Sequence, residues 1–235
     1  MAAVENKRTL DCAGKATAEI NQFLRNAAAD GVNEVEVLNP QARHNLAVSI
    51  TDPIRLVFRG HVGYYAVSLC DHVRAEILGS AGWGVGDNLM EGEVVVHGNA
   101  ASAAAPSLRG GRVVIKGSVG PRSGIGQKWG DLIVGGDAGY MTGFMMQKGR
   151  IVICGDAAGS LGDSMYDGAI YVGGEITELG NGVAVVEAGK EDLDELREML
   201  AGYGIKPPKG FKKLICDGTL HHFDKKDFDV WKEVL

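Results

Sequence analysis

Two aspartates, Asp137 and Asp156, are the residues of this sequence whose type and spacing most suggest chemistry. They lie 19 residues apart, and Asn99, Ser118 and Glu175 occupy equivalent places at the same interval. Paired carboxylates can act as a general acid and a general base. A polar side chain at a turn can instead accept a hydrogen bond from a backbone amide. The second interpretation is the simpler one, and an enzyme that uses this acidic row stays open as an alternative.

A second candidate is the glycine-rich stretch GWGVG, at residues 82–86. A glycine loop that binds a phosphate follows a strand, precedes a helix and occurs once. A glycine-rich corner of a repeating scaffold comes back at a fixed interval. Internal repeats therefore decide between these two interpretations.

Two series of glycines recur every 19 residues. The first consists of Gly60, Gly79, Gly98, Gly117, Gly136, Gly155 and Gly174. The second consists of Gly92, Gly111, Gly130, Gly149 and Gly168. Because GWGVG falls within this repeat and lacks a following helix, we interpret it as a corner of the scaffold.

Short β-branched segments lie between the glycines: EVVVHG, RVVIKG, DLIVGG, RIVICG and AIYVGG. Residues two apart in a strand share a face. Two apolar rows follow, one running from Leu56 to Ile170 and the other from Phe58 to Val172, both at the 19-residue interval. A unit of 19 residues is too short for a strand–helix–strand crossover of about 30 residues. The sequence therefore predicts a mainly β fold, a parallel β-helix of about seven coils.

The outward positions form two further rows. Glu93, Arg112, Asp131 and Arg150 alternate in charge, which favours pairing between neighbouring strands. The other row becomes apolar from its third position onward, with Val95, Val114, Ile133, Val152 and Tyr171. A continuous apolar stripe on an outer face needs a cover. Either the ends of the chain supply it, or the stripe is a docking surface for a partner subunit.

The two ends lie outside the repeat, so we expect three parts: an N-terminal cap (1–52), the β-helix (53–183) and a C-terminal helix with a docking tail (184–235). The cap contains a helix from about Thr17 to Asp30 and a strand at 34–38, followed by a structural Arg43–His44 pair. The tail contains a helix over 191–200 and a hairpin around Asp217. Phe228 and Trp231 suggest a final helical turn, and His221 and His222 point to opposite faces of a strand, which argues against a shared metal.

Composition narrows the functional classes. The net charge of −6 argues against nucleic acid or an anionic membrane as the main partner. No apolar run reaches the roughly 20 residues of a membrane span, and the first residues lack the apolar core of a signal peptide, so we expect a cytoplasmic protein. The four cysteines, Cys12, Cys70, Cys154 and Cys216, are far apart and suit reduced thiols rather than a metal site.

Five segments carry a resemblance to a known family: LDCAGKATAEINQFLRNAA, NPQARHNLAVSI, RGHVGYYA, GSAGWGVGDNLMEGEVVVHGNA and GDAAGSLGDSMYDGAIYVGG. They resemble the stand-alone GXGXG subunit of glutamate synthase-type enzymes, most of all the small subunit of the N-methylglutamate synthases. The resemblance covers nearly the whole chain, including FKKLICDGTLHHFD near its end. The run from GGDAGYMTG to GDAAGSLGDSM is also similar to a subunit of formylmethanofuran dehydrogenase, the second alternative.

The resemblance implies a single-stranded, right-handed parallel β-helix without catalytic residues or cofactors of its own. It implies a hetero-oligomer with a class II glutamine amidotransferase-like subunit and a subunit that binds FMN, often with an iron–sulfur cluster. The amidotransferase nucleophile in such complexes is an N-terminal cysteine, whereas Cys12 is internal. The chain would join these partners beside the ammonia path, and the amine, ammonia or methylamine, would be chosen by them.

Overall fold

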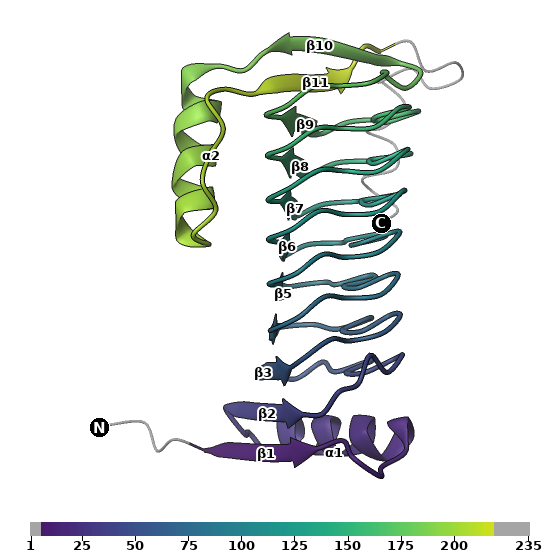
Figure 1. The fold of residues 1–235 in the computed structure, drawn as a ribbon, viewed down its shortest axis with the longest axis vertical. Helices are drawn as coiled ribbons and strands as arrows, with labels where there is room; N and C mark the ends of the chain where they lie inside the picture. Colours follow the sequence, from purple (N-terminus) through teal and green to yellow (C-terminus); the bar gives the residue numbers. More distant parts are fainter. Residues whose placement is uncertain (1–5, 219–235) are drawn as a thin grey trace, which may run out of the picture.

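The computed structural model, described here for residues 6–218, is a rod of stacked parallel coils (Figure 1). Within this described range, eleven strands form one continuous sheet along the rod, in the order β1-β2-β3-β4-β5-β6-β7-β8-β9-β11-β10. Strands β1 to β9 are parallel, and β11 and β10 are antiparallel additions at one end. The predicted parallel β-helix of about seven coils is confirmed.

Seven strands carry the repeat, and each contributes one residue to each of the two inward rows. They are β3 (Ile54–Arg59), β4 (Val73–Ile77), β5 (Gly92–Val96), β6 (Arg112–Ile115), β7 (Asp131–Val134), β8 (Arg150–Ile153) and β9 (Ala169–Val172). Their pairing aligns Val94 with Val113 and Val96 with Ile115, and so on along the rod. The inward rows are buried and form one core. The register predicted from the 19-residue interval is therefore confirmed.

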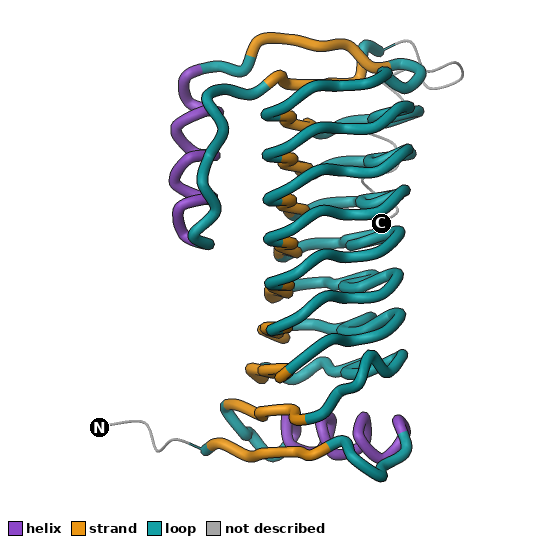
Figure 2. Tube along the Cα trace, in the orientation of Figure 1, coloured by secondary structure: helices purple, strands orange, loops and turns teal. Residues whose placement is uncertain are grey.

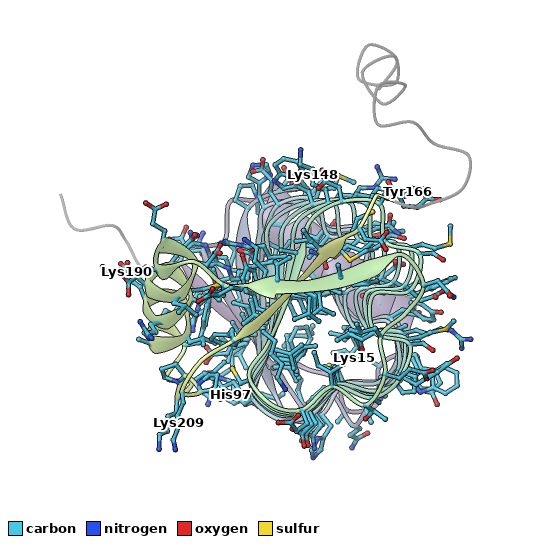
Figure 3. All side chains as sticks on the ribbon, turned by 90° about the horizontal axis from the view of Figure 1, so that it is seen from above. Lys15, His97, Lys148, Tyr166, Lys190 and Lys209 are labelled. Atoms are coloured by element: carbon cyan, nitrogen blue, oxygen red, sulfur yellow. The ribbon has the colours of Figure 1, made fainter. Side chains whose placement is uncertain are left out.

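A second column of isolated parallel bridges closes each coil after its strand. It runs Val62, Ala81, Ala100, Val119, Ala138, Ala157 and Ile176. The rest of each coil is loop, so strands occupy one side of the rod and turns the other (Figure 2). Seen along the long axis, the coils superimpose and α2 lies to one side (Figure 3).

The turns have an unusual backbone that explains GWGVG. Three columns of residues take positive φ angles, two residues apart within a turn and 19 apart between coils. The first column is Tyr65, Gly84, Ala103, Arg122, Met141 and Ser160; the second is Val67, Gly86, Ala105, Gly124, Gly143 and Gly162; the third is Leu69, Asn88, Ser107, Gly126, Met145 and Ser164. Their amides bond carbonyls of adjacent coils, as Gly84 does to Ser102 and Gly86 to Ala66. GWGVG is thus one corner in a stack, and no helix follows it.

The N-terminal end is part of the same stack. Strands β1 (Lys7–Asp11) and β2 (Glu34–Leu38) extend the sheet of β3, and α1 (Thr17–Ala29) buries Ile20 and Leu24 in the common core. Residues 39–52 form a further turn layer, in which Asn45 donates to the carbonyl of Tyr64 and Ser49 to that of Ser68. The helix and strand predicted here are confirmed, but the sheet and core run continuously across the boundary expected at residue 52.

The C-terminal part closes the other end of the rod and returns along its side. Strand β10 (Val183–Glu187) leads into α2 (Lys190–Gly202), and β11 (Lys212–Cys216) then inserts between β9 and β10. Helix α2 runs alongside the strand face of the upper coils (Figure 1). The second half of the predicted hairpin, the pair His221 and His222, and the residues Phe228 and Trp231 lie outside the described residues.

Candidate functional site

The acidic row predicted from the 19-residue interval is a continuous hydrogen-bonded ladder. It contains His61, Ser80, Asn99, Ser118, Asp137, Asp156 and Glu175, at the corner that follows each strand. In every step the side chain of one member accepts a hydrogen bond from the backbone N–H of the next. The Asp137 Oδ1 to Asp156 N distance is 2.8 Å, and the Asp156 Oδ1 to Glu175 N distance is 2.7 Å. The interpretation as a polar row that bonds backbone amides is confirmed.

The ladder has a chemical consequence for both aspartates. One carboxylate oxygen of each is held by an amide of the next coil, which the stack fixes in place. At the upper end, Lys212 Nζ contacts both Glu175 Oε2 and the Gly174 carbonyl at 3.0 Å. These side chains therefore act as spacers between coils, a role that any short acceptor can fill, which explains why Ser, Asn, Asp and His all occur in the row.

Replacing Asp156 with alanine should lower the free energy of unfolding by about 0.5–1.5 kcal/mol, because the Glu175 amide loses its partner. Asp156→Asn keeps an oxygen acceptor in the same position and should be close to neutral. Urea unfolding of the wild type and both variants measures this difference. Equal losses for alanine and asparagine would show that the carboxylate charge, rather than the acceptor, matters.

The outward apolar stripe is covered by the chain itself. Val114, Ile133 and Val152 are fully buried and Tyr171 nearly so, while Val95 is partly exposed at the margin. They form a second core with Leu196 and Leu200 of α2, together with Ala188 and Ile205. Of the two covers considered, the chain's own end is the one found. The stripe is therefore not the exposed docking surface that a partner would need, because α2 excludes other surfaces from it.

Charged groups surround this second core and hold α2 in place. The Asp131 carboxylate forms ion pairs with the guanidinium groups of Arg112, at 2.9 Å, and Arg150, at 2.8 Å, as the alternating row predicts. Arg150 also bonds Glu195 of α2 at 2.6 Å, and Arg112 donates to the Tyr203 hydroxyl at 3.0 Å. Tyr203 in turn donates to Glu93. The row thus binds the helix as well as its own neighbouring strands.

Asp192 anchors the first turn of α2. Its carboxylate lies 2.9 Å from Lys213 Nζ, 2.7 Å from the Tyr171 hydroxyl and 3.1 Å from the Gly189 amide. Burial alone would raise the pKa of this carboxyl, but the hydrogen bonds from Lys213, Tyr171 and Gly189 outweigh that effect and lower it. The ionised form is therefore the one that the folded state stabilises.

Asp192→Asn should destabilise the chain by about 1–2 kcal/mol near neutral pH, because it removes a charged acceptor from three donors. Since the folded pKa is lowered, this contribution is complete above the usual pKa of about 4 and disappears as the pH falls through the folded value. The measurement is the difference in unfolding free energy between variant and wild type as a function of pH. Asp194→Asn, on the exposed side of the same helix, is the matched control. A difference that stays constant into the acid range would contradict the role of the ionised carboxylate.

Arg43 and His44 have the structural role that the sequence predicted, because both form hydrogen bonds to the backbone. Arg43 donates to the Lys15 carbonyl, and His44 Nδ1 accepts the Tyr64 amide at 2.9 Å. The His44 ring stacks on Tyr64 with centroids 4.2 Å apart, and Tyr64 stacks on Trp83 at 5.1 Å. This exposed stack was not predicted from the sequence, although the 19-residue interval between Tyr64 and Trp83 was its signal.

The four cysteines are free thiols, and Cys12 and Cys70 are buried. Burial raises the pKa of Cys70 and of Cys154 to about 11 and raises that of Cys12 as well. A nucleophilic cysteine needs a lowered pKa, so these three are poor thiolates at neutral pH. Within residues 6–218, no group of three or more His, Cys, Asp or Glu side chains is placed to hold a metal ion. No helix in the same part of the chain is long and apolar enough to cross a membrane.

Comparison with known proteins adds no identification. No family model matches the chain. No curated protein matches it either.

Proposed function

We propose that this chain is a scaffold subunit of a glutamate synthase-like complex, of the type that forms glutamate or N-methylglutamate. The observation that most supports a scaffold is the polar ladder. Its aspartates are the best catalytic candidates of the sequence, but one carboxylate oxygen of each accepts a hydrogen bond from the backbone of the next coil. The choice of complex rests on the resemblance of the five sequence segments to the GXGXG subunit.

In this proposal the chemistry belongs to two partners. A class II amidotransferase-like subunit handles the glutamine-derived nitrogen, and a subunit that binds FMN, with or without an iron–sulfur cluster, carries out the redox step. The chain holds them in a fixed relation beside the ammonia path. A stack of coils whose turn amides bond neighbouring coils suits that task, because it offers a long surface that resists bending.

The test is purification of a tagged chain from its native cells, followed by mass spectrometry of the proteins that remain bound. The proposal expects an amidotransferase-like and an FMN-binding subunit in defined stoichiometry. Subunits of a molybdenum or tungsten formylmethanofuran enzyme would support the second alternative instead. A chain that purifies alone and turns over glutamine or an amine would support the self-contained enzyme.

A further inference from the structure

The turn side of the rod carries an exposed aromatic surface that no other part of the chain covers among the described residues. We define the turn face as residues 63–69, 82–88, 101–107, 120–126 and 139–145, one turn from each of five coils. Six of the ten large exposed hydrophobic side chains belong to it: Tyr64, Tyr65, Leu69, Trp83, Tyr140 and Met145. Their exposed fractions range from 40% to 50%. Exposed apolar groups gathered in this way are typical of interaction sites.

The aromatic residues stand at two places along the rod, and two turns without aromatic residues lie between them. Trp83 and Tyr140 occupy the same position of coils three repeats apart, and Ser102 and Pro121 take that position between them. Of the two turns between them, 101–107 (ASAAAPS) has only small side chains, and 120–126 (GPRSGIG) adds Arg122 and Ile125. At about 4.8 Å per coil, Trp83 and Tyr140 are roughly 14 Å apart. An α-helix with its side chains is about 10–12 Å wide, so one helix fits across the rod between them.

The charge of the coils between the two aromatic places favours an acidic helix. Residues 94–130 contain five Lys and Arg residues and no Asp or Glu, in a chain whose net charge is −6. Arg109 and Arg122 are exposed, and Lys128 is partly so. Arg122 and Lys128 form no ion pair within residues 6–218, and in the same part of the chain the Arg109 side chain bonds the neutral Asn88 at 3.2 Å. Arg122 lies in the next turn, and Arg109 and Lys128 lie two residues after the turns of 101–107 and 120–126. Three cations beside a turn of small residues, with aromatic rings on either side, suit a ligand that is both acidic and apolar.

We infer that the turn face between Trp83 and Tyr140 binds an acidic amphipathic α-helix of a partner subunit. The helix lies across the rod, places apolar side chains on the band of 101–107 and presents carboxylates to Arg109, Arg122 and Lys128. This surface lies on the side of the rod away from α2 (Figure 2). The inference deepens the proposed scaffold function and rests on it for the identity of the partner, but the surface itself is argued from this chain alone.

The experiment places a photo-crosslinking amino acid at Ser102 in the full-length chain in its native cells. The expected product joins Ser102 to a helix of a partner protein with at least two acidic residues in the crosslinked peptide. Arg122→Glu should reduce both this product and co-purification of the partner about tenfold or more, since it places a like charge against the carboxylates. Arg197→Glu, on the exposed side of α2, is the control and should leave both unchanged. Melting curves of both variants check that the fold is intact.

The outcomes separate this inference from the proposed function. If the expected subunits co-purify at wild-type levels with Arg122→Glu and do not crosslink at Ser102, the inference is wrong and the scaffold function stands. If Ser102 captures an acidic helix of another kind of protein and Arg122→Glu releases it, the inference stands and the proposed complex is wrong. A crosslink to a second copy, to residues 219–235 of the same chain or to a peptide without acidic residues would overturn the inference, as would a chain that binds no partner.

Discussion

Ile133→Glu is expected to destabilise the isolated chain by roughly 3–5 kcal/mol, because it places a charge in the second core without a partner. Ile133 is fully buried between the sheet and α2, among Val114, Val152 and Leu196. Thermal and urea unfolding of the isolated chain measure the loss. Gln147→Glu adds the same charge at an exposed position and should change stability little.

The same variant distinguishes the two covers of the stripe that the sequence left open. If α2 covers Ile133 in solution, the isolated chain loses stability. If the stripe were exposed and a partner covered it, the isolated chain would unfold normally and only assembly would suffer. A normal melting curve for Ile133→Glu would therefore contradict the position of α2.

Gly92→Ala should lower the free energy of unfolding by about 2–4 kcal/mol. Gly92 opens β5 with a φ of +110°, and a Cβ at this position would lie 2.2 Å from the carbonyl oxygen of Val73. Both strands are fixed by pairing on either side, so neither can move away. The backbone angle and the contact act in the same direction.

Gly202→Ala is the matched control for the glycine series. Gly202 lies at the end of α2, has no positive φ and has no atom within 4 Å of the added carbon. Alanine should stabilise the helix there by up to about 1 kcal/mol. Urea unfolding of the two variants side by side tests whether the second glycine series, represented by Gly92, is required by its positive φ and its close approach to the preceding coil. Similar, small effects for both would contradict it.

The coil repeat was predictable because its causes are local. The interval of 19 residues fixes which side chains stack, so the inward rows, the charged row and the polar ladder all follow from spacing alone. The ladder could be interpreted as structural because Asn99 and Ser118 stand in the same row as Asp137 and Asp156, and all four share only the ability to accept a hydrogen bond. Such regularities depend on neighbours one coil away.

The position of α2 was not predictable in this way. Its apolar face, Leu193, Leu196 and Leu200, shows that the helix packs on something, but not on what. The contacts that settle it, such as Arg150 with Glu195, join residues 45 apart and depend on the path of the chain through β10 and β11. The left-handed turns at Ala103 and Arg122 were also missed, because these residue types give no sign of a positive φ.

The proposed scaffold role requires that this chain supports a reaction without taking part in it. The most direct test is reconstitution of glutamate or N-methylglutamate synthesis from the amidotransferase-like and FMN-binding subunits with a chain that carries both Asp137→Asn and Asp156→Asn. These changes keep the acceptors of the ladder and leave Glu175 as its one carboxylate, so no two carboxylates remain side by side in the row. We expect the complex to assemble and to work at the wild-type rate, whereas omission of the chain should abolish coupled synthesis. An assembled complex that loses its activity with the double variant would contradict the scaffold role and place the chemistry in this chain.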